Sequence, residues 1–157
     1  MTPIVSICLL LLSSCGAGVN SSSEELSGGS FFRESGSALN SITSHNGLHR
    51  TIYSRIIAYN HNGDFIVAVQ KPNFEYHRIL IASELNTGHE DFRILEKSAD
   101  SILTHDPYYL KIFSAKVNFW IIVNKTHELI GPMTKDEYLA KRKELNIPDD
   151  LELDVKP

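Results

Sequence analysis

Residues 54–72, SRIIAYNHNGDFIVAVQKP, are the stretch that decides the fold. Two largely apolar runs, Ser54–Asn60 and Asp64–Lys71, flank the dipeptide Asn62-Gly63. This dipeptide tolerates the positive φ angles of a type I′ turn better than most others. The stretch therefore predicts a β-hairpin, and Pro72 ends its second strand because proline cannot donate to a ladder.

The predicted turn also sets the register of the hairpin. A turn centred on Asn62-Gly63 pairs Tyr59 with Ile66 and Ile57 with Ala68. Both faces of such a hairpin are largely apolar. We therefore expect it to lie centrally in a sheet that is covered on both sides.

After the hairpin, the pattern changes from strand to helix. Tyr76–Ala82 is predicted as a third strand, and Asn86-Thr87-Gly88 breaks the chain after it. From Asp91 onward, apolar residues recur at steps of three and four, which indicates an amphipathic helix. These residues are Phe92, Leu95, Ala99, Ile102 and Leu103. Asp106-Pro107 supplies an N-cap and a proline at the first helical position, so a second short helix should follow, through Ala115.

The C-terminal third begins with the strongest strand in the sequence, Asn118–Val123. A polar turn over residues 124–127 connects it to a strand at Glu128–Gly131, which Pro132 should stop. Thr134–Glu137 has the spacing of a capping box, in which the Thr and Glu side chains satisfy backbone N–H groups at a helix start.

The helix after the capping box is further specified by Met133 and Tyr138, which occupy the two positions of a hydrophobic staple. We expect it to run to about Leu145. Leu151, Leu153 and Val155 alternate with acidic residues, which suits a short edge strand or a docked tail. Locally paired strands with helices between them predict an α+β fold with a small antiparallel sheet of about five strands and two or three helices. One globular domain should span residues 51–157.

The N-terminus is typical of a bacterial lipoprotein signal peptide over residues 1–14. The apolar run Ile4–Leu12 has the length of a signal-peptide core and is shorter than the roughly 20 residues that a bilayer requires. Leu12-Ser13-Ser14-Cys15 resembles a lipobox, which implies cleavage before Cys15 and acylation of that residue. Acyl chains on Cys15 would anchor the protein to a membrane of the bacterial cell envelope.

Residues 15–50 are interpreted as the lipidated cysteine and a flexible tether, because Ser, Gly, Asn and Thr dominate this interval. Such a coil has a root-mean-square span of roughly 30–35 Å. Phe31-Phe32 is either a docking contact or an incidental apolar pair. Glu24-Glu25 is either a solvating feature or a surface-export signal.

Composition narrows the function classes. The 157 residues carry a formal net charge of −4 without clustered Lys or Arg, which argues against nucleic acid as a partner. Cys8 and Cys15 both lie in the signal region. The mature domain would therefore lack a thiol for a disulfide, a thiolate metal site or a cysteine nucleophile.

The histidines and carboxylates indicate no catalytic residue, metal site or cofactor. His45 and His49 have metal-ligand spacing, but they fall in the predicted tether without an accompanying carboxylate. His89-Glu90-Asp91 better suits the first turn of a helix. In His105-Asp106, the aspartate already serves as a helix cap. Phosphate-binding glycine loops and Gly-x-Ser-x-Gly elbows are absent from the sequence.

Aromatic residues supply the candidate ligand surface. Tyr108, Tyr109, Phe119 and Trp120 could line such a surface, although neighbouring strand residues point to opposite faces. Trp120 and Tyr138 are the candidate exposed ligand-binding residues, because amphipathic aromatics commonly anchor interfaces. Packing in the core is the favoured interpretation of both, and ligand binding is the alternative.

Three segments carry a family resemblance: Phe65–Pro72, then Asp100–Leu103 with Asp106–Tyr109, and then Asn118–Val123 through Leu129–Met133 and Glu137-Tyr138. Over roughly Tyr53 to Leu151, they resemble a small family of uncharacterised bacterial envelope lipoproteins. The resemblance implies a lipid-anchored single domain. It carries no assigned activity, so it transfers no catalytic residues.

These observations favour a non-enzymatic, lipid-anchored envelope protein whose domain binds a protein or another envelope component. The alternative is a lipid-anchored enzyme of hydrolase type with an unrecognised site. A convergent His/Asp/Glu or Ser/His pocket would favour the enzyme. A flat aromatic surface would favour binding.

Overall fold

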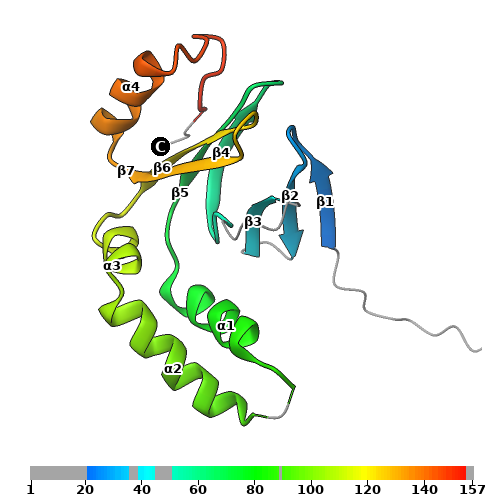
Figure 1. Cartoon of the computed structure of the whole chain (residues 1–157), viewed down its shortest axis with the longest axis vertical. Coiled ribbons are helices and arrows are strands. Elements are labelled where there is room, and N and C mark those ends of the chain that lie inside the picture. Colours follow the sequence, from blue (N-terminus) through cyan, green and yellow to red (C-terminus); the bar gives the residue numbers. More distant parts are fainter. Residues whose placement is uncertain (1–20, 36–38, 45–50, 89, 155–157) are drawn as a thin grey trace, which may run out of the picture.

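The computed structural model describes residues 21–35, 39–44, 51–88 and 90–154 (Figure 1). Within them lie seven strands: β1 (Ser21–Glu25), β2 (Ser30–Ser35), β3 (Leu39–Ser44), β4 (Ile56–His61), β5 (Phe65–Gln70), β6 (Asn118–Val123) and β7 (Glu128–Met133). The four helices are α1 (Phe74–Leu85), α2 (Phe92–His105), α3 (Pro107–Phe113) and α4 (Lys135–Glu144). The strands form two antiparallel sheets, β1-β2-β3 and β4-β5-β6-β7. The predicted α+β class is confirmed.

The predicted hairpin is present as β4 and β5, but its predicted register is wrong. Tyr59 pairs with Ala68 and not with Ile66. The backbone N–H of Asn62 donates to Phe65 O over 2.9 Å, so the turn is centred one residue later than predicted. Moving the centre of a turn by one residue moves the register by two.

A side-chain cap explains the shifted turn. Asn62 Oδ1 accepts hydrogen bonds of 2.9 Å from the backbone N–H groups of both Asp64 and Phe65. Neither Asn62 nor Gly63 has a positive φ angle, so the turn is not of type I′. The local bonding of the Asn side chain decides the geometry here, as it commonly does in Asx turns.

Helix α1 occupies the segment predicted as a third strand, so that prediction is wrong. Asn73 caps the helix, since its Oδ1 accepts from Tyr76 N over 2.9 Å. Glu75 adds an acidic group to the first turn, where the helix dipole favours it. The sequence signal is Pro72-Asn73 followed by Glu75. One face of α1 is buried through His77, Ile81 and Ala82.

The predicted tether is wrong for residues 21–35 and 39–44, which form the three-stranded sheet. A few apolar side chains are enough to hold this small sheet in place, because they pack onto the core of the four-stranded sheet. Ile42 is fully buried, and Phe32 stacks on Tyr59 of β4 with ring centroids 4.6 Å apart. The Tyr59 hydroxyl donates to Glu24 Oε2 over 2.6 Å.

Hydrogen bonds from both side chains and backbone join the small sheet to the larger one. The Asn40 side chain replaces a strand partner at the edge of β4, because its Nδ2 donates to Ile56 O over 2.8 Å and its Oδ1 accepts from Ile56 N over 2.6 Å. Ile42 and Ile52 form an isolated bridge with bonds of 3.0 and 2.9 Å. Ser27 and Asn124 are joined by a 2.8 Å side-chain bond.

The four-stranded sheet is covered on both faces, as the apolar pattern of the hairpin predicts. One face meets β2, β3, the β1–β2 connection and α3 in a cluster formed by Leu26, Ile42, Ile52, Ile56, Ile66, Ala68, Ile112, Trp120, Ile122 and Leu129, with Phe32 packed against it. The other face meets α4 and the C-terminal segment through Val67, Ile121, Met133, Tyr138, Ile147 and Leu151. Strand β5 is central, and all but its first residue are buried.

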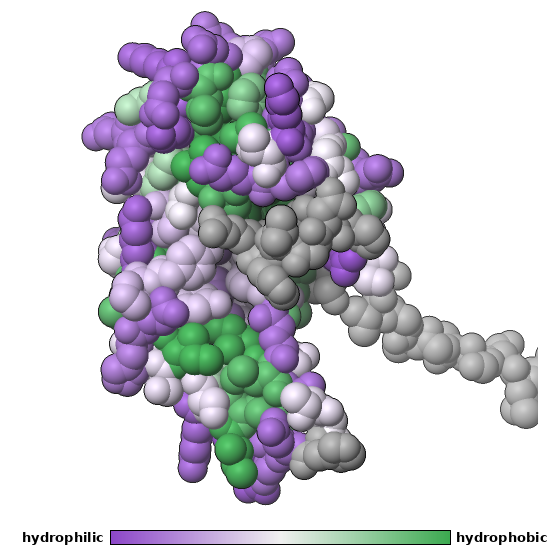
Figure 2. Space-filling model, viewed as in Figure 1, coloured by the Kyte–Doolittle hydropathy of each residue, from purple (hydrophilic) through white to green (hydrophobic). Residues whose placement is uncertain are grey.

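Helices α1 and α2 pack against each other as a hairpin that extends beyond the sheets (Figure 1). Their contact consists of Ile81, Ala82, Leu95, Ala99 and Leu103, which confirms the helical period predicted from Asp91 onward. Hydrophobic side chains also show on the surface of this part (Figure 2). Phe74, Ile79, Phe92 and Ile94 are among the exposed large apolar residues of the two helices. No described helix is long and apolar enough to cross a bilayer.

The C-terminal predictions hold except at Pro132. The capping box is present, with Thr134 Oγ1 accepting from Glu137 N and Glu137 Oε2 accepting from Thr134 N. However, Pro132 does not stop β7, which continues to Met133 beside an irregularity in its pairing with β6. The C-terminal segment docks without forming a described strand, and Arg142 Nη1 donates to Leu151 O over 2.7 Å.

A buried polar cluster links β5, β6, α3 and the segment before β4. Gln70 Oε1 accepts from Trp120 Nε1 over 3.0 Å and from Asn118 Nδ2 over 3.2 Å. Gln70 Nε2 donates to Tyr53 O over 2.8 Å. Asn118 Nδ2 also donates to Ile112 O over 2.9 Å. All three polar side chains are at most 2% exposed, so each bond replaces contact with water.

Replacing Gln70 with leucine should destabilise the domain by about 2–6 kcal/mol. The substitution leaves the Trp120 N–H and the Tyr53 carbonyl buried without their partner, at about 1–3 kcal/mol for each unsatisfied group. Denaturant unfolding measures the effect, and the matched control is Lys71→Leu at the exposed neighbouring position, which should stay within about 0.5 kcal/mol. Equal midpoints for the two variants would contradict the network.

Candidate functional site

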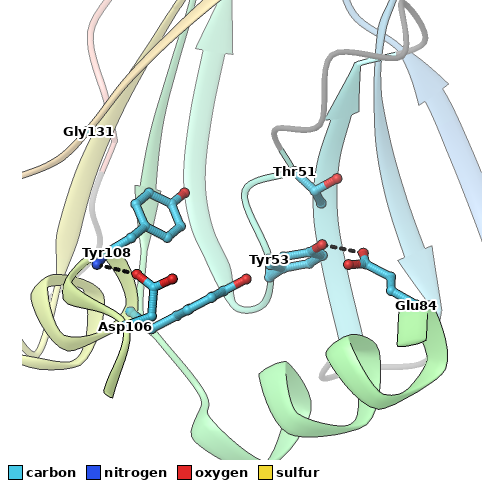
Figure 3. Close-up of a pocket in the computed structure, with 7 residues that line it drawn as sticks. Thr51, Tyr53, Glu84, Asp106, Tyr108 and Gly131 are labelled. Carbon is cyan, nitrogen blue, oxygen red and sulfur yellow. Dashed lines mark hydrogen bonds between the residues drawn. The ribbon is translucent and has the colours of Figure 1, made fainter. Parts of the chain in front are cut away.

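A pocket of about 590 Å³ lies where the helical hairpin, α3 and the sheets meet (Figure 3). Its volume is within the range of small-ligand sites, roughly 300–1,000 Å³. Two carboxylates and three tyrosine rings give it a polar and aromatic lining. The lining residues are Thr51, Tyr53, Glu84, Asp106, Tyr108, Tyr109 and Gly131.

One wall of the pocket is the start of α3. Asp106 caps this helix, because its Oδ1 accepts from the Tyr108 backbone N–H over 2.8 Å, and Pro107 occupies the first turn. The predicted Asp106-Pro107 cap is therefore confirmed. The cap places Tyr108 and Tyr109 in the first turn of α3, where both side chains line the pocket. Their rings are close to perpendicular, with centroids 5.2 Å apart and an interplanar angle of 76°.

The opposite wall is formed by Tyr53 and by Glu84 in the last turn of α1 (Figure 3). The Tyr53 hydroxyl donates to Glu84 Oε1 over 2.5 Å. Burial, followed by this hydrogen bond and the negative charge of Glu84, raises the Tyr53 pKa well above its usual value. The phenol therefore stays protonated and remains a donor to the carboxylate. The backbone of Tyr53 is fixed independently by Gln70.

His77 packs beneath the tyrosine rings. It is fully buried and makes edge contacts with Tyr53, Tyr109 and Phe113 at centroid distances of 5.4, 6.3 and 5.0 Å. His77 Nδ1 lies 2.8 Å from Asn73 O, which can only accept, so Nδ1 carries the proton. Burial lowers the His77 pKa and so favours the neutral ring. The other nitrogen, Nε2, is buried without a hydrogen-bond partner among the described residues.

The pocket has a negative electrostatic character. Glu84 and Asp106 are its charged groups, and no Lys, Arg or His is among the described residues that line it. Burial, followed by Tyr108, Glu84 and Asp106, raises the pKa of Tyr109 to about 12. A neutral phenol is thus favoured over a phenolate, since a further negative charge would face the two carboxylates.

Trp120 and Tyr138 do not lie in this pocket. Trp120 is 1% exposed and Tyr138 is 4% exposed, so the prediction that they could present an exposed surface is wrong. The favoured prediction, packing in the core, is confirmed for both. Trp120 satisfies its N–H through Gln70, and Tyr138 stacks on Phe119 with centroids 5.0 Å apart.

Of the aromatic residues singled out in the sequence, Tyr108 and Tyr109 line the pocket. Sequence reasoning missed Tyr53 and Glu84, which lie far from them in the chain. The only local signal was the Asp106-Pro107 cap, which orients the two adjacent tyrosines. Glu84 lines the pocket from the last turn of α1, whereas the sequence predicted a strand at Tyr76–Ala82.

The remaining candidates are not among the described residues that line the pocket. Cys15, His45, His49 and His89 lie outside the described residues. His105 Nδ1 lies 2.8 Å from Ser101 O within α2. Among the residues that the structure describes, no group of three or more His, Cys, Asp or Glu side chains could hold a metal ion.

Fold and pocket together define an α+β protein with two antiparallel sheets and a polar aromatic cavity beside a helical hairpin. Residues 88–156 match a family described as a protein of unknown function, DUF3997. The matched region runs from just before α2 to beyond α4 and includes Asp106, Tyr108 and Tyr109. A resemblance to a family without assigned function is thus confirmed for this region. No curated protein and no solved structure matches the chain.

The raised Tyr109 pKa predicts a loss of stability at alkaline pH. The folded state holds this proton until about pH 12, whereas the unfolded chain releases it near the usual pKa of 10. The unfolded state therefore binds fewer protons in this window, and the free energy of unfolding should fall as pH rises from about 10 to about 12. Tyr109→Phe should make this fall shallower without changing the pH dependence between pH 7 and 9. Denaturant unfolding across this range tests it, and identical slopes would contradict it.

Proposed function

We propose that this protein is a lipid-anchored binding module of the bacterial cell envelope, held through Cys15. It binds its ligand in the tyrosine pocket, which is the cavity lined by Tyr53, Tyr108 and Tyr109 together with Glu84 and Asp106. The observation that carries the binding role is the composition of the pocket. It combines aromatic rings with oriented carboxylates, which are groups that fix a ligand in place. The lipobox-like sequence at residues 12–15 supports the anchor.

The start of β1 bears on how such an anchor would act. Six residue steps separate Cys15 from Ser21, where β1 begins. A fully extended chain spans at most about 3.3–3.6 Å per residue, which limits this distance to about 20 Å. An acylated Cys15 would therefore hold the domain next to the membrane surface. Its ligand would be a component found close to that surface.

Binding is favoured over the alternative of a hydrolase-type enzyme. A nucleophilic mechanism needs a side-chain nucleophile within hydrogen-bond reach of a base. Thr51 supplies a hydroxyl, but no histidine is among the described lining residues. Glu84 accepts from Tyr53, and Asp106 caps α3. Both carboxylates thus already have structural hydrogen bonds.

The anchor is tested by Cys15→Ala. The variant should lose incorporation of a labelled fatty acid and move from the membrane fraction to the soluble fraction, because it lacks the acylated thiol. Cys8→Ala is the matched control and should retain both properties. Acyl labelling and membrane association that survive in Cys15→Ala would refute the anchor.

The binding role is tested by site-specific photocrosslinking in cells. A photoreactive phenylalanine at Tyr108, which lines the pocket and is 40% exposed, should form a specific adduct. The same group at Ile94, which is 61% exposed on α2, is the control and should not form this adduct. Identical adduct patterns at the two positions, or none at Tyr108, would contradict binding in the pocket.

A further inference from the structure

We propose that the tyrosine pocket recognises a positively charged ammonium group, carried either by a small molecule or by a lysine side chain of a partner. This inference rests on the proposed binding function and names the chemistry of the ligand. It follows from three properties of the pocket: its charge, its aromatic walls and its size.

The charge of the pocket selects for a cation. Glu84 and Asp106 stand on opposite walls, and no basic side chain among the described lining residues neutralises them (Figure 3). An anionic ligand would be repelled by both groups. A neutral ligand would displace water from the carboxylates without replacing the charge interaction. An ammonium group is attracted by the negative charge of both carboxylates and can pair with either one.

The aromatic walls add a second interaction that only a cation gains. Tyr53, Tyr108 and Tyr109 all line the cavity, and the last two rings are set at 76° to each other. A cation within about 6 Å of a tyrosine ring is attracted by its negative face. Sites for organic ammonium ions are commonly lined by several such rings. His77 makes edge contacts with the rings of Tyr53 and Tyr109. This packing orients the two rings before a ligand binds.

The size and donor set distinguish an organic ammonium ion from a metal ion. The cavity of about 590 Å³ is far larger than a bare ion requires. Calcium would need six to eight oxygen ligands. Among the lining residues that are described, two carboxylates stand on separate walls, and each already accepts a hydrogen bond. An organic ammonium ion, whose carbon substituents help to fill the cavity, fits this arrangement better.

Three probes separate charge from shape and identify the source of the ammonium group. Choline represents a free quaternary ammonium ion, and 3,3-dimethylbutan-1-ol has nearly the same shape without the charge. Nα-acetyl-lysine amide represents the side chain of a protein partner. Binding of each to the full chain is measured by titration of the tyrosine ring signals in NMR spectra. At least one ammonium probe should bind more than tenfold more tightly than the neutral alcohol.

Two variants remove the charges while keeping the hydrogen bonds. Glu84→Gln retains an oxygen that can accept from Tyr53, and Asp106→Asn retains an N-cap of equal quality. Each should weaken binding of the ammonium probe about two- to fivefold, and Tyr108→Leu should weaken it by a similar factor. Asp150→Asn, an exposed position outside the pocket, is the control and should leave affinity unchanged.

The results distinguish a wrong ligand class from a wrong function. Tighter binding of choline than of the lysine amide assigns a small-molecule source, and the reverse order assigns a partner's side chain. Equal affinity for the neutral alcohol, or unchanged affinity in both charge variants, would overturn the ammonium proposal. If photocrosslinking at Tyr108 still yields its adduct, the binding function stands and only the ligand class is wrong. If the photocrosslinking adduct at Tyr108 and the preference for an ammonium probe are both absent, the proposed binding function is overturned as well.

Discussion

The hydrogen bonds of one buried side chain, Gln70, connect the parts of the molecule that form the pocket. Its amide oxygen accepts from Trp120 and Asn118 of β6, and its amide nitrogen holds the backbone of Tyr53. Asn118 extends the connection to the end of α3 through Ile112 O. Tyr53 on one wall and the start of α3 on the other belong to these two connected segments, and Glu84 joins the Tyr53 wall from α1. A buried polar network of this kind is costly when any member is missing, which makes its geometry specific.

The pocket combines rigid support with an unusual charge distribution. The cap of Asp106 and the packing of His77 orient the tyrosine rings, while Glu84 and Asp106 give the cavity its negative charge. If Cys15 is acylated, the short segment before β1 would place this cavity within reach of components at the membrane surface. Anchor and pocket would then act together, since the anchor restricts which ligands the pocket meets.

Sequence predicted the elements that local chemistry specifies. The Thr134 capping box, the Asp106-Pro107 cap and the strand at β6 are all present. Errors arose where distant contacts or side-chain caps decided the outcome. The Asn62 side chain shifts the hairpin turn, and the Asn73 cap makes α1 a helix. The strands β1–β3 depend on a core supplied by the rest of the chain. The candidate site was predicted only at Tyr108 and Tyr109, because Tyr53 and Glu84 join them through tertiary packing.

The central claim is that the Gln70 network is intact in solution and fixes the pocket. The chain contains a single tryptophan, so its indole N–H gives one assignable NMR signal. Because this N–H is buried and bonded to Gln70, its exchange with deuterium should require global unfolding. Its opening free energy should therefore equal the free energy of unfolding measured with denaturant. Exchange through local openings, well before global unfolding, would contradict the account.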